Sequence, residues 1–85
     1  MKYKIEFTHA AEKQLAEIPR VDLKKLAKRI EKLASEPFPP GHEKMKGHDH
    51  LYRIRQGDYR AIYSVFEGKL LILVVKIGHR REIYR

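Results

Sequence analysis

The chain has 85 residues, which allows one domain with a small core, because a domain this short buries only about 60% of its extended surface. It contains no cysteine, so disulfides and thiolate metal sites are excluded. Nineteen basic residues against 11 acidic ones give a net charge of +8, which favours a polyanionic partner such as nucleic acid, an anionic membrane surface or an acidic protein. We expect a single domain over residues 1–85.

Residues 2–7 alternate between apolar and charged side chains, which predicts a half-buried strand. Thr8 is suited to cap a short helix that ends at Pro19. Asp22 could cap a second helix, whose apolar residues recur at i, i+3, i+4 and i+7 until the chain reaches Pro37. We interpret the lysines on the remaining positions of this helix as its solvated side, which adds only long-range attraction.

A loop is predicted from Pro37 to about residue 50, because prolines and glycines interrupt any regular pattern there. Two strands then form a hairpin closed at Gln56-Gly57. The second hairpin strand runs over 58–66, and after a turn at Glu67-Gly68 the apolar run 69–77 predicts a buried strand. The order is β-α-α-β-β-β, an α+β fold with a helical hairpin packed on one face of a mostly antiparallel four-stranded sheet.

The hairpin places arginines on the face away from the helices. With a turn at Gln56-Gly57, Arg55 lies opposite Asp58 and Arg53 lies opposite Arg60. Like charges opposite each other destabilise a sheet, so the second pair is either a small cost at a wet surface or a site for an anion. For Arg55 the alternative is a surface ion pair with Asp58, worth about 0–1 kcal/mol.

The last strand and the tail extend this face. Continuing the register puts Leu71, Leu73, Val75 and Ile77 beneath the arginines as an apolar floor, and His79 is the next residue on that side. Arg80, Arg81 and Tyr84 follow in the tail, within reach of the same end. Arginine forks suit phosphate oxygens and a tyrosine ring can stack on a base, so the pattern indicates a pocket for single-stranded RNA.

The histidines allow several interpretations. The segment His48-Asp49-His50 is a weak metal signal, since it offers few ligands and no cysteine, and we expect no metal and no cofactor. His79 could act as a general acid or base beside the arginines, or it could pack at the end of its strand.

Several motifs together resemble the RelE/ParE superfamily of toxins from toxin–antitoxin pairs, and the resemblance covers essentially the whole chain. The matching segments are Lys46-Gly47, Tyr52-Arg53-Ile54-Arg55, Gly57-Asp58-Tyr59-Arg60, Tyr63 and Ile77-Gly78-His79-Arg80-Arg81-Glu82-Ile83-Tyr84. RelE-type members bind in the ribosomal A site and cleave mRNA through attack of a ribose 2′-OH on the adjacent phosphate. The resemblance therefore implies a ribosome-dependent endoribonuclease that inhibits translation.

The resemblance also implies roles for individual residues. Arg60 and Arg80 would stabilise the charge of the phosphorane, and Tyr84 would stack on or orient the nucleotide. The remaining RNA contacts would come from Arg53, Arg55, Arg81 and Lys46. The best-known RelE pattern has lysines in place of Arg53 and Arg55, and an arginine cannot lose its proton. His79 is therefore the candidate general base, and catalysis by positioning and charge alone is the alternative.

The resemblance further implies a RelB-like antitoxin, helical and acidic, that covers the basic face in a hetero-oligomeric complex. The N-terminus lacks the apolar segment of a signal peptide and the apolar runs are too short to span a bilayer, so we expect a cytoplasmic protein without membrane contact. Two alternatives stay open: a ParE-like inhibitor of DNA gyrase, and an RNA-binding module without catalytic activity.

Overall fold

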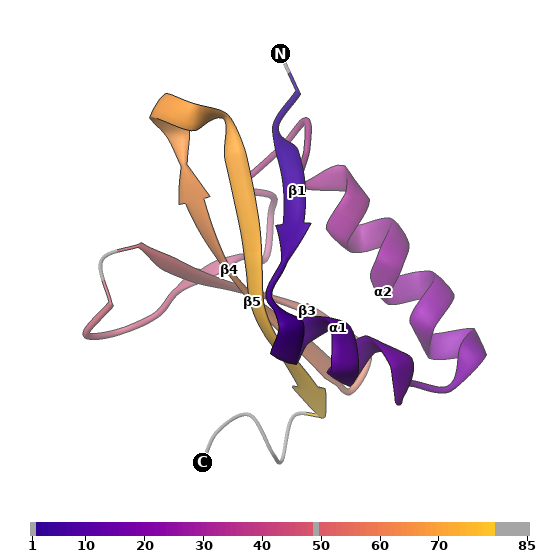
Figure 1. The fold of residues 1–85 in the computed structure, drawn as a ribbon. Coiled ribbons are helices and arrows are strands. Elements are labelled where there is room, and N and C mark those ends of the chain that lie inside the picture. Colours follow the sequence, from indigo (N-terminus) through magenta and orange to yellow (C-terminus); the bar gives the residue numbers. More distant parts are fainter. Residues whose placement is uncertain (1, 49, 80–85) are drawn as a thin grey trace.

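The computed structural model describes residues 2–48 and 50–79, and within them the chain forms a sheet with two α-helices on one side (Figure 1). Strand β1 (Lys4–Phe7) leads into α1 (His9–Ala16) and α2 (Arg20–Lys32). The remaining strands are β2 (Glu43–Lys44), β3 (Leu51–Gln56), β4 (Tyr59–Phe66) and β5 (Leu71–His79), with a short 3₁₀ helix at Glu67–Lys69. None of the helices in the described residues is long and apolar enough to cross a membrane.

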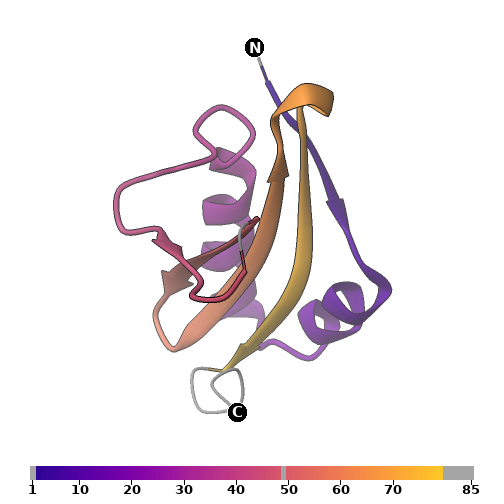
Figure 2. The same ribbon diagram turned by 90° about the vertical axis from the view of Figure 1, so that its left-hand side faces the viewer.

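The strand order in the sheet is β1-β5-β4-β3-β2, with β1 parallel to β5 and the other neighbours antiparallel. The predicted α+β fold and its mostly antiparallel sheet are confirmed. The prediction of four strands was wrong, because the described residues form five (Figure 2). The additional strand, β2, has two exposed charged residues inside the predicted loop, so it carries no alternation that a sequence pattern could reveal.

The helix starts follow the sequence with one shift. Thr8 caps α1 as predicted, since its Oγ1 accepts a hydrogen bond from the Ala11 N–H at 3.1 Å. Helix α2 begins three residues earlier than expected, after Pro19, so the prediction of Asp22 as its cap was wrong. Asp22 lies in the first turn instead, where its carboxylate faces the positive end of the helix dipole.

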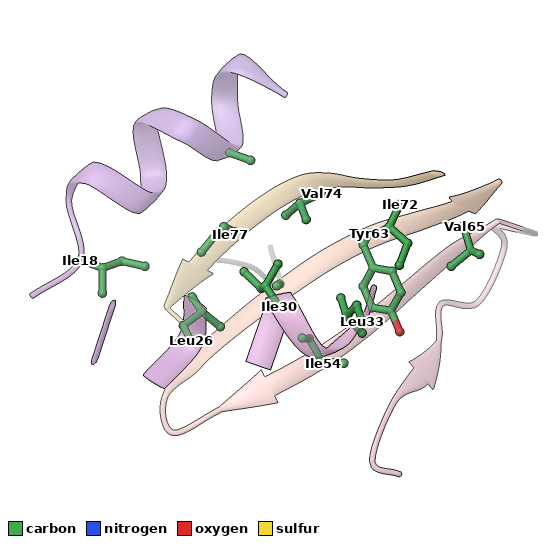
Figure 3. Packing of buried hydrophobic residues seen from close by; sticks show 12 residues of the cluster. Ile18, Leu26, Ile30, Leu33, Ile54, Tyr63, Val65, Ile72, Val74 and Ile77 are labelled. Atoms are coloured by element: carbon green, nitrogen blue, oxygen red, sulfur yellow. The ribbon is translucent and has the colours of Figure 1, made fainter. Parts of the chain in front are cut away.

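The core lies between the helices and one face of the sheet (Figure 3). Leu26 and Ile30 of α2, together with Leu33 at its C-terminal cap, pack against side chains of the three inner strands. Among these, the buried Tyr63 donates a hydrogen bond from its hydroxyl to the Pro37 carbonyl oxygen at 2.8 Å, which ties the loop after α2 to the sheet. Burial raises the pKa of Tyr63 above its usual range, so the hydroxyl stays protonated and remains a donor.

A β-bulge interrupts the pairing of β4 with β5. Ile62 pairs with Lys76 and Tyr63 pairs with Val74, so Val75 is an extra residue in β5. The Thr8 hydroxyl donates to the Val75 carbonyl oxygen at 2.8 Å, and the Ile77 N–H donates to Oε1 of Gln14 at 2.7 Å. Helix α1 and its cap therefore hold β5 at the extra residue and just after it, and every residue of β5 after Val75 changes face relative to an uninterrupted strand.

The β3–β4 hairpin turns one residue later than predicted. Gln56 pairs with Tyr59 and Arg55 with Arg60, so the turn consists of Gly57 and Asp58. Gly57 has a φ of +62°, a conformation that favours glycine at the first position of a tight turn. The predicted pairs of Arg55 with Asp58 and of Arg53 with Arg60 were therefore wrong, although the shift of two positions in pairing leaves each side chain on its predicted face.

Candidate nucleic-acid interface

The face of the sheet away from the helices carries cationic side chains around Ile62. The register of β3, β4 and β5 places Arg53 opposite Ile62, Ile62 opposite Lys76, and Arg55 opposite Arg60. We call these four cations, Arg53, Arg55, Arg60 and Lys76, the basic face. Their residue types, held on neighbouring strands, suit the oxygens of a phosphate group.

Arg60 is the most enclosed cation of the basic face, with 7% of its surface exposed. Its partner in β5 is Gly78, which has no side chain, so nothing bulky stands beside the guanidinium on that strand. Arg55, directly opposite in β3, is exposed. A buried arginine beside an exposed one gives a rigid donor next to a solvent-accessible one, at the cost of like-charge repulsion.

Arg53 has a partner that the sequence analysis missed. Its Nη2 lies 2.9 Å from Oε2 of Glu43 in β2, and 17% of its side chain is exposed. The sequence analysis placed only Arg60 opposite Arg53 and missed this carboxylate, because it did not detect strand β2, which pairs Glu43 with Arg53. Lys46, predicted as an RNA contact, lines the same surface hollow as Arg53.

Lys76 is a member of the basic face that the sequence analysis did not name. In an uninterrupted strand it would point toward the helices, and only the extra residue Val75 turns it to the side of Ile62. The apolar floor expected beneath the arginines is correspondingly shorter. Leu71 and Leu73 pair with residues on that face, but Ile77 is fully buried in the core on the other side. The sequence signal for this position was a charged residue, Lys76, inside an otherwise apolar run.

The bulge also moves His79, and its expected place on the arginine side was wrong. His79 pairs with Tyr59, whose side chain packs against the core beneath the helices. The two ring centroids lie 5.7 Å apart with an interplanar angle of 84°, an edge-to-face contact. His79 and Tyr59 line a hollow together with Gln14, Glu17 and Ile18 of the α1 segment. The imidazole is therefore half-buried on the side opposite Arg60.

The other predicted site residues, Arg80, Arg81 and Tyr84, lie outside the described residues. His48 and His50 are exposed loop residues. In residues 2–48 and 50–79, no group of three His, Cys, Asp or Glu side chains could hold a metal ion. The chemistry that the described part of the basic face can perform is thus the binding and charge stabilisation of an anion.

Comparison with known proteins gives a consistent result. A family model described as the ParE toxin of type II toxin–antitoxin systems, parDE, matches residues 5–84. The putative toxin RelE1 of Methanocaldococcus jannaschii is 33% identical over 88 residues, which cover 100% of this chain and 98% of that protein.

Solved structures agree. A chain of the archaeal RelE–RelB complex from Pyrococcus horikoshii OT3 superposes with a TM-score of 0.83 at 30% identity, over 94% of this chain and 97% of the other. A chain of the RelB–RelE antitoxin–toxin complex from Methanococcus jannaschii gives a TM-score of 0.77 at 26% identity, over 93% and 94% of the two chains.

Proposed function

We propose, on the premise that this chain belongs to the RelE/ParE superfamily of toxins of type II toxin–antitoxin systems, that it is a ribosome-dependent endoribonuclease acting on mRNA in the A site. Its partner is a RelB-like antitoxin, as in the complexes of the solved relatives. The observation that carries the nuclease proposal is the basic face, where the buried Arg60 stands beside Gly78 and opposite Arg55.

The reaction needs a group that holds a phosphate and neutralises the charge it gains. When a ribose 2′-oxygen attacks the adjacent phosphorus, the bond from phosphorus to the 5′-oxygen breaks, the 2′-OH loses a proton and the leaving 5′-oxygen takes one up. Negative charge grows on the non-bridging oxygens in between. A guanidinium already fixed in place stabilises that charge without reorganising, and one such donor contributes about 2.7–4 kcal/mol in comparable sites. Arg60 is the described residue best placed for this role.

The other cations of the basic face position the strand. The exposed Arg55 and Lys76 flank Arg60 and Ile62, and we assign them contacts to phosphates of the bound mRNA. Arg53, held by Glu43, and Lys46 extend this path toward β2. The proposed roles of Arg80 in phosphorane stabilisation, Arg81 in RNA binding and Tyr84 in nucleotide stacking rest on the resemblance to RelE.

The geometry favours catalysis by positioning and charge alone over proton transfer by His79. His79 packs against Tyr59 on the helix side of the sheet, whereas the phosphate donors stand on the other side. We therefore propose that the described residues contribute by positioning and charge stabilisation, and that His79 supports the end of β5.

The experiment that tests the proposal is to induce the protein in cells and map mRNA ends, with Arg60→Ala as the comparison. Cleavage within translated codons that depends on Arg60 supports it, and intact mRNA in growth-arrested cells contradicts it. The matching family model carries the ParE name, so inhibition of DNA gyrase is the second candidate and a supercoiling assay runs alongside. Binding to ribosomes without any cleavage would identify the non-catalytic RNA-binding module.

A further inference from the structure

Helix α2 carries a second group of cations, separate from the basic face. Lys25, Lys28, Arg29 and Lys32 stand at i, i+3, i+4 and i+7, so they form one continuous row along the helix, which we call the α2 stripe. Leu26 and the other buried residues of α2 face the core, and the stripe lies beside them on the flank that reaches the β3–β4 hairpin. Figure 1 shows α2 on the outside of the molecule.

The stripe borders a hollow of about 250 Å³ whose other wall is Gln56, at the end of β3. Among the described residues, those lining the hollow are cations and one amide, without a carboxylate. Like charges four residues apart on a helix destabilise it by about 0.2–0.5 kcal/mol per pair, and Lys25 with Arg29 and Lys28 with Lys32 are two such pairs. The helix therefore carries a local cost that an anion in the hollow would relieve.

Arg29 is the fixed member of the stripe. Its Nη2 donates a hydrogen bond to the Pro40 carbonyl oxygen at 3.3 Å, which holds the side chain against the loop after α2. Its Nε is buried, and within the described residues it has no hydrogen-bond partner. Arg29 thus gives the stripe a positioned cation, while the three lysines around it are exposed and mobile enough to follow a backbone.

The hollow and the held Arg29 change the interpretation of these lysines as only a solvated side. We propose that the α2 stripe binds the phosphate backbone of structured RNA in the ribosome, as a docking surface distinct from the basic face. This inference rests on the proposed function. Gln56 borders the stripe, while the preceding Arg55 points to the other side of the sheet. The α2 stripe and the basic face therefore lie on opposite sides of the end of β3. The α2 stripe can then bind the ribosome while the basic face binds the mRNA.

The lining chemistry favours RNA over a protein partner. Protein interfaces need apolar or aromatic anchors at their centre and are depleted in charge there, whereas nucleic-acid interfaces are polar and strongly basic. The hollow at the α2 stripe offers no apolar side chain among the described residues that line it. A second hollow shows the opposite composition, being lined by Ile5, Phe7, Leu15, Leu23, Ala27, Ile30 and Glu31.

The test compares two triple variants with the same net charge. Lys25→Gln/Lys28→Gln/Lys32→Gln removes the exposed lysines of the stripe and keeps Arg29, because that side chain holds the loop. Lys2→Gln/Lys13→Gln/Lys69→Gln removes three exposed lysines elsewhere and serves as the matched control. Urea unfolding establishes that both variants fold. Binding to purified bacterial 70S ribosomes without mRNA is then measured between about 50 and 200 mM salt.

Each lost phosphate contact lowers the slope of log K against log salt by about 0.7–0.9, so the stripe variant should show a slope smaller by about 2 and an affinity weaker by about tenfold or more at low salt. The control variant should keep the wild-type slope. Equal ribosome affinity and salt dependence in the two variants would overturn the inference. A stripe variant that binds ribosomes normally but loses affinity for the antitoxin would overturn it as well.

The outcome also separates this inference from the nuclease proposal. Wild-type protein that binds ribosomes through the stripe and leaves mRNA intact would remove the nuclease proposal alone. If the wild-type protein cleaves mRNA and the stripe variant binds and cleaves like the control, only the proposal for the α2 stripe is contradicted.

Discussion

The two sides of the sheet at the end of β5 differ in chemistry although the same few residues build both. On one side Lys76 and Gly78 adjoin Ile62 and Arg60, and on the other Ile77 and His79 adjoin Ala61 and Tyr59. The first side gathers cations, and the second packs a core and closes a hollow against α1.

One inserted residue decides this distribution. If Val75 were paired as a regular residue of the ladder, without the bulge, the alternation of β5 would place Ile77 and His79 on the side of Arg60 and turn Lys76 toward the helices. The bulge thus puts a lysine on the anion-binding side and an imidazole on the packing side. The hydroxyl of Thr8 donates to the Val75 carbonyl oxygen and the side-chain amide oxygen of Gln14 accepts from the Ile77 N–H, so α1 and its cap fix the backbone where β5 changes which residues face the helices.

The largest expected effect comes from removing the enclosed cation of the basic face. Arg60→Ala should lower the single-turnover rate of mRNA cleavage on programmed ribosomes by about 10²–10³-fold, because it deletes a preorganised donor to the phosphorane. The free energy of unfolding, measured in urea, shows whether the variant remains folded under the assay conditions.

Arg60→Lys keeps the charge and loses the guanidinium fork, so it should recover only part of the rate. Lys69→Gln, at an exposed position of the 3₁₀ helix, is the control and should cleave like the wild type. An Arg60→Ala protein that is folded and cleaves at the wild-type rate would remove the basic face from the mechanism.

The next prediction contrasts neighbouring residues on the two sides. Lys76→Gln should slow cleavage by about tenfold, since it loses one charge-assisted contact to phosphate. His79→Ala should change the same rate by less than about threefold, because its ring contacts Tyr59 and faces away from Arg60.

The pH profile sharpens this contrast. With His79 outside the proton transfer, the wild type and His79→Ala should share the same dependence of rate on pH. A variant whose pH profile lacks a limb that the wild type shows, together with a large fall in rate, would restore His79 as the general base.

Sequence patterns predicted the features that depend on local periodicity or on a helix cap. The alternation in β1, the apolar period of α2 and the Thr8 cap all appear as expected, because burial of one face and satisfaction of helix amides act locally. The basic strand face was likewise recoverable, since a turn shifted to Gly57-Asp58 changes pairs but leaves Arg53, Arg55 and Arg60 on one side.

What the sequence could not supply depends on single residues. The bulge at Val75 does not change the apolar pattern of its strand, and Lys76 is the one residue there whose charge departs from that pattern. Strand β2 likewise gives no sequence signal, because Glu43 and Lys44 are both exposed and form a strand only through their pairing with β3. These two features decided the errors at His79 and Arg53, so the misplacements in the site follow from pairing rather than composition.

The third prediction breaks the support of the bulge itself. Thr8→Ala removes both the hydrogen bond accepted from the Ala11 N–H and the one donated to the Val75 carbonyl oxygen. The free energy of unfolding measured in urea should therefore fall by about 1–3 kcal/mol. Thr8→Ser keeps the hydroxyl and should lose much less. Equal losses in the two variants would show that the methyl group, and not the hydrogen bonds, supports this end of α1.

The smallest expected effect lies deep on the packing side. Tyr63→Phe keeps the buried ring and deletes the hydroxyl that donates to the Pro37 carbonyl oxygen, so the free energy of unfolding should fall by about 1 kcal/mol. The rate of mRNA cleavage by the folded variant should stay at the wild-type value, because Tyr63 faces the helices and Arg60 does not. If the variant unfolds like the wild type but cleaves more slowly, then the two sides of the sheet are coupled through the loop at Pro37, and the separation between a packing side and an anion-binding side does not hold.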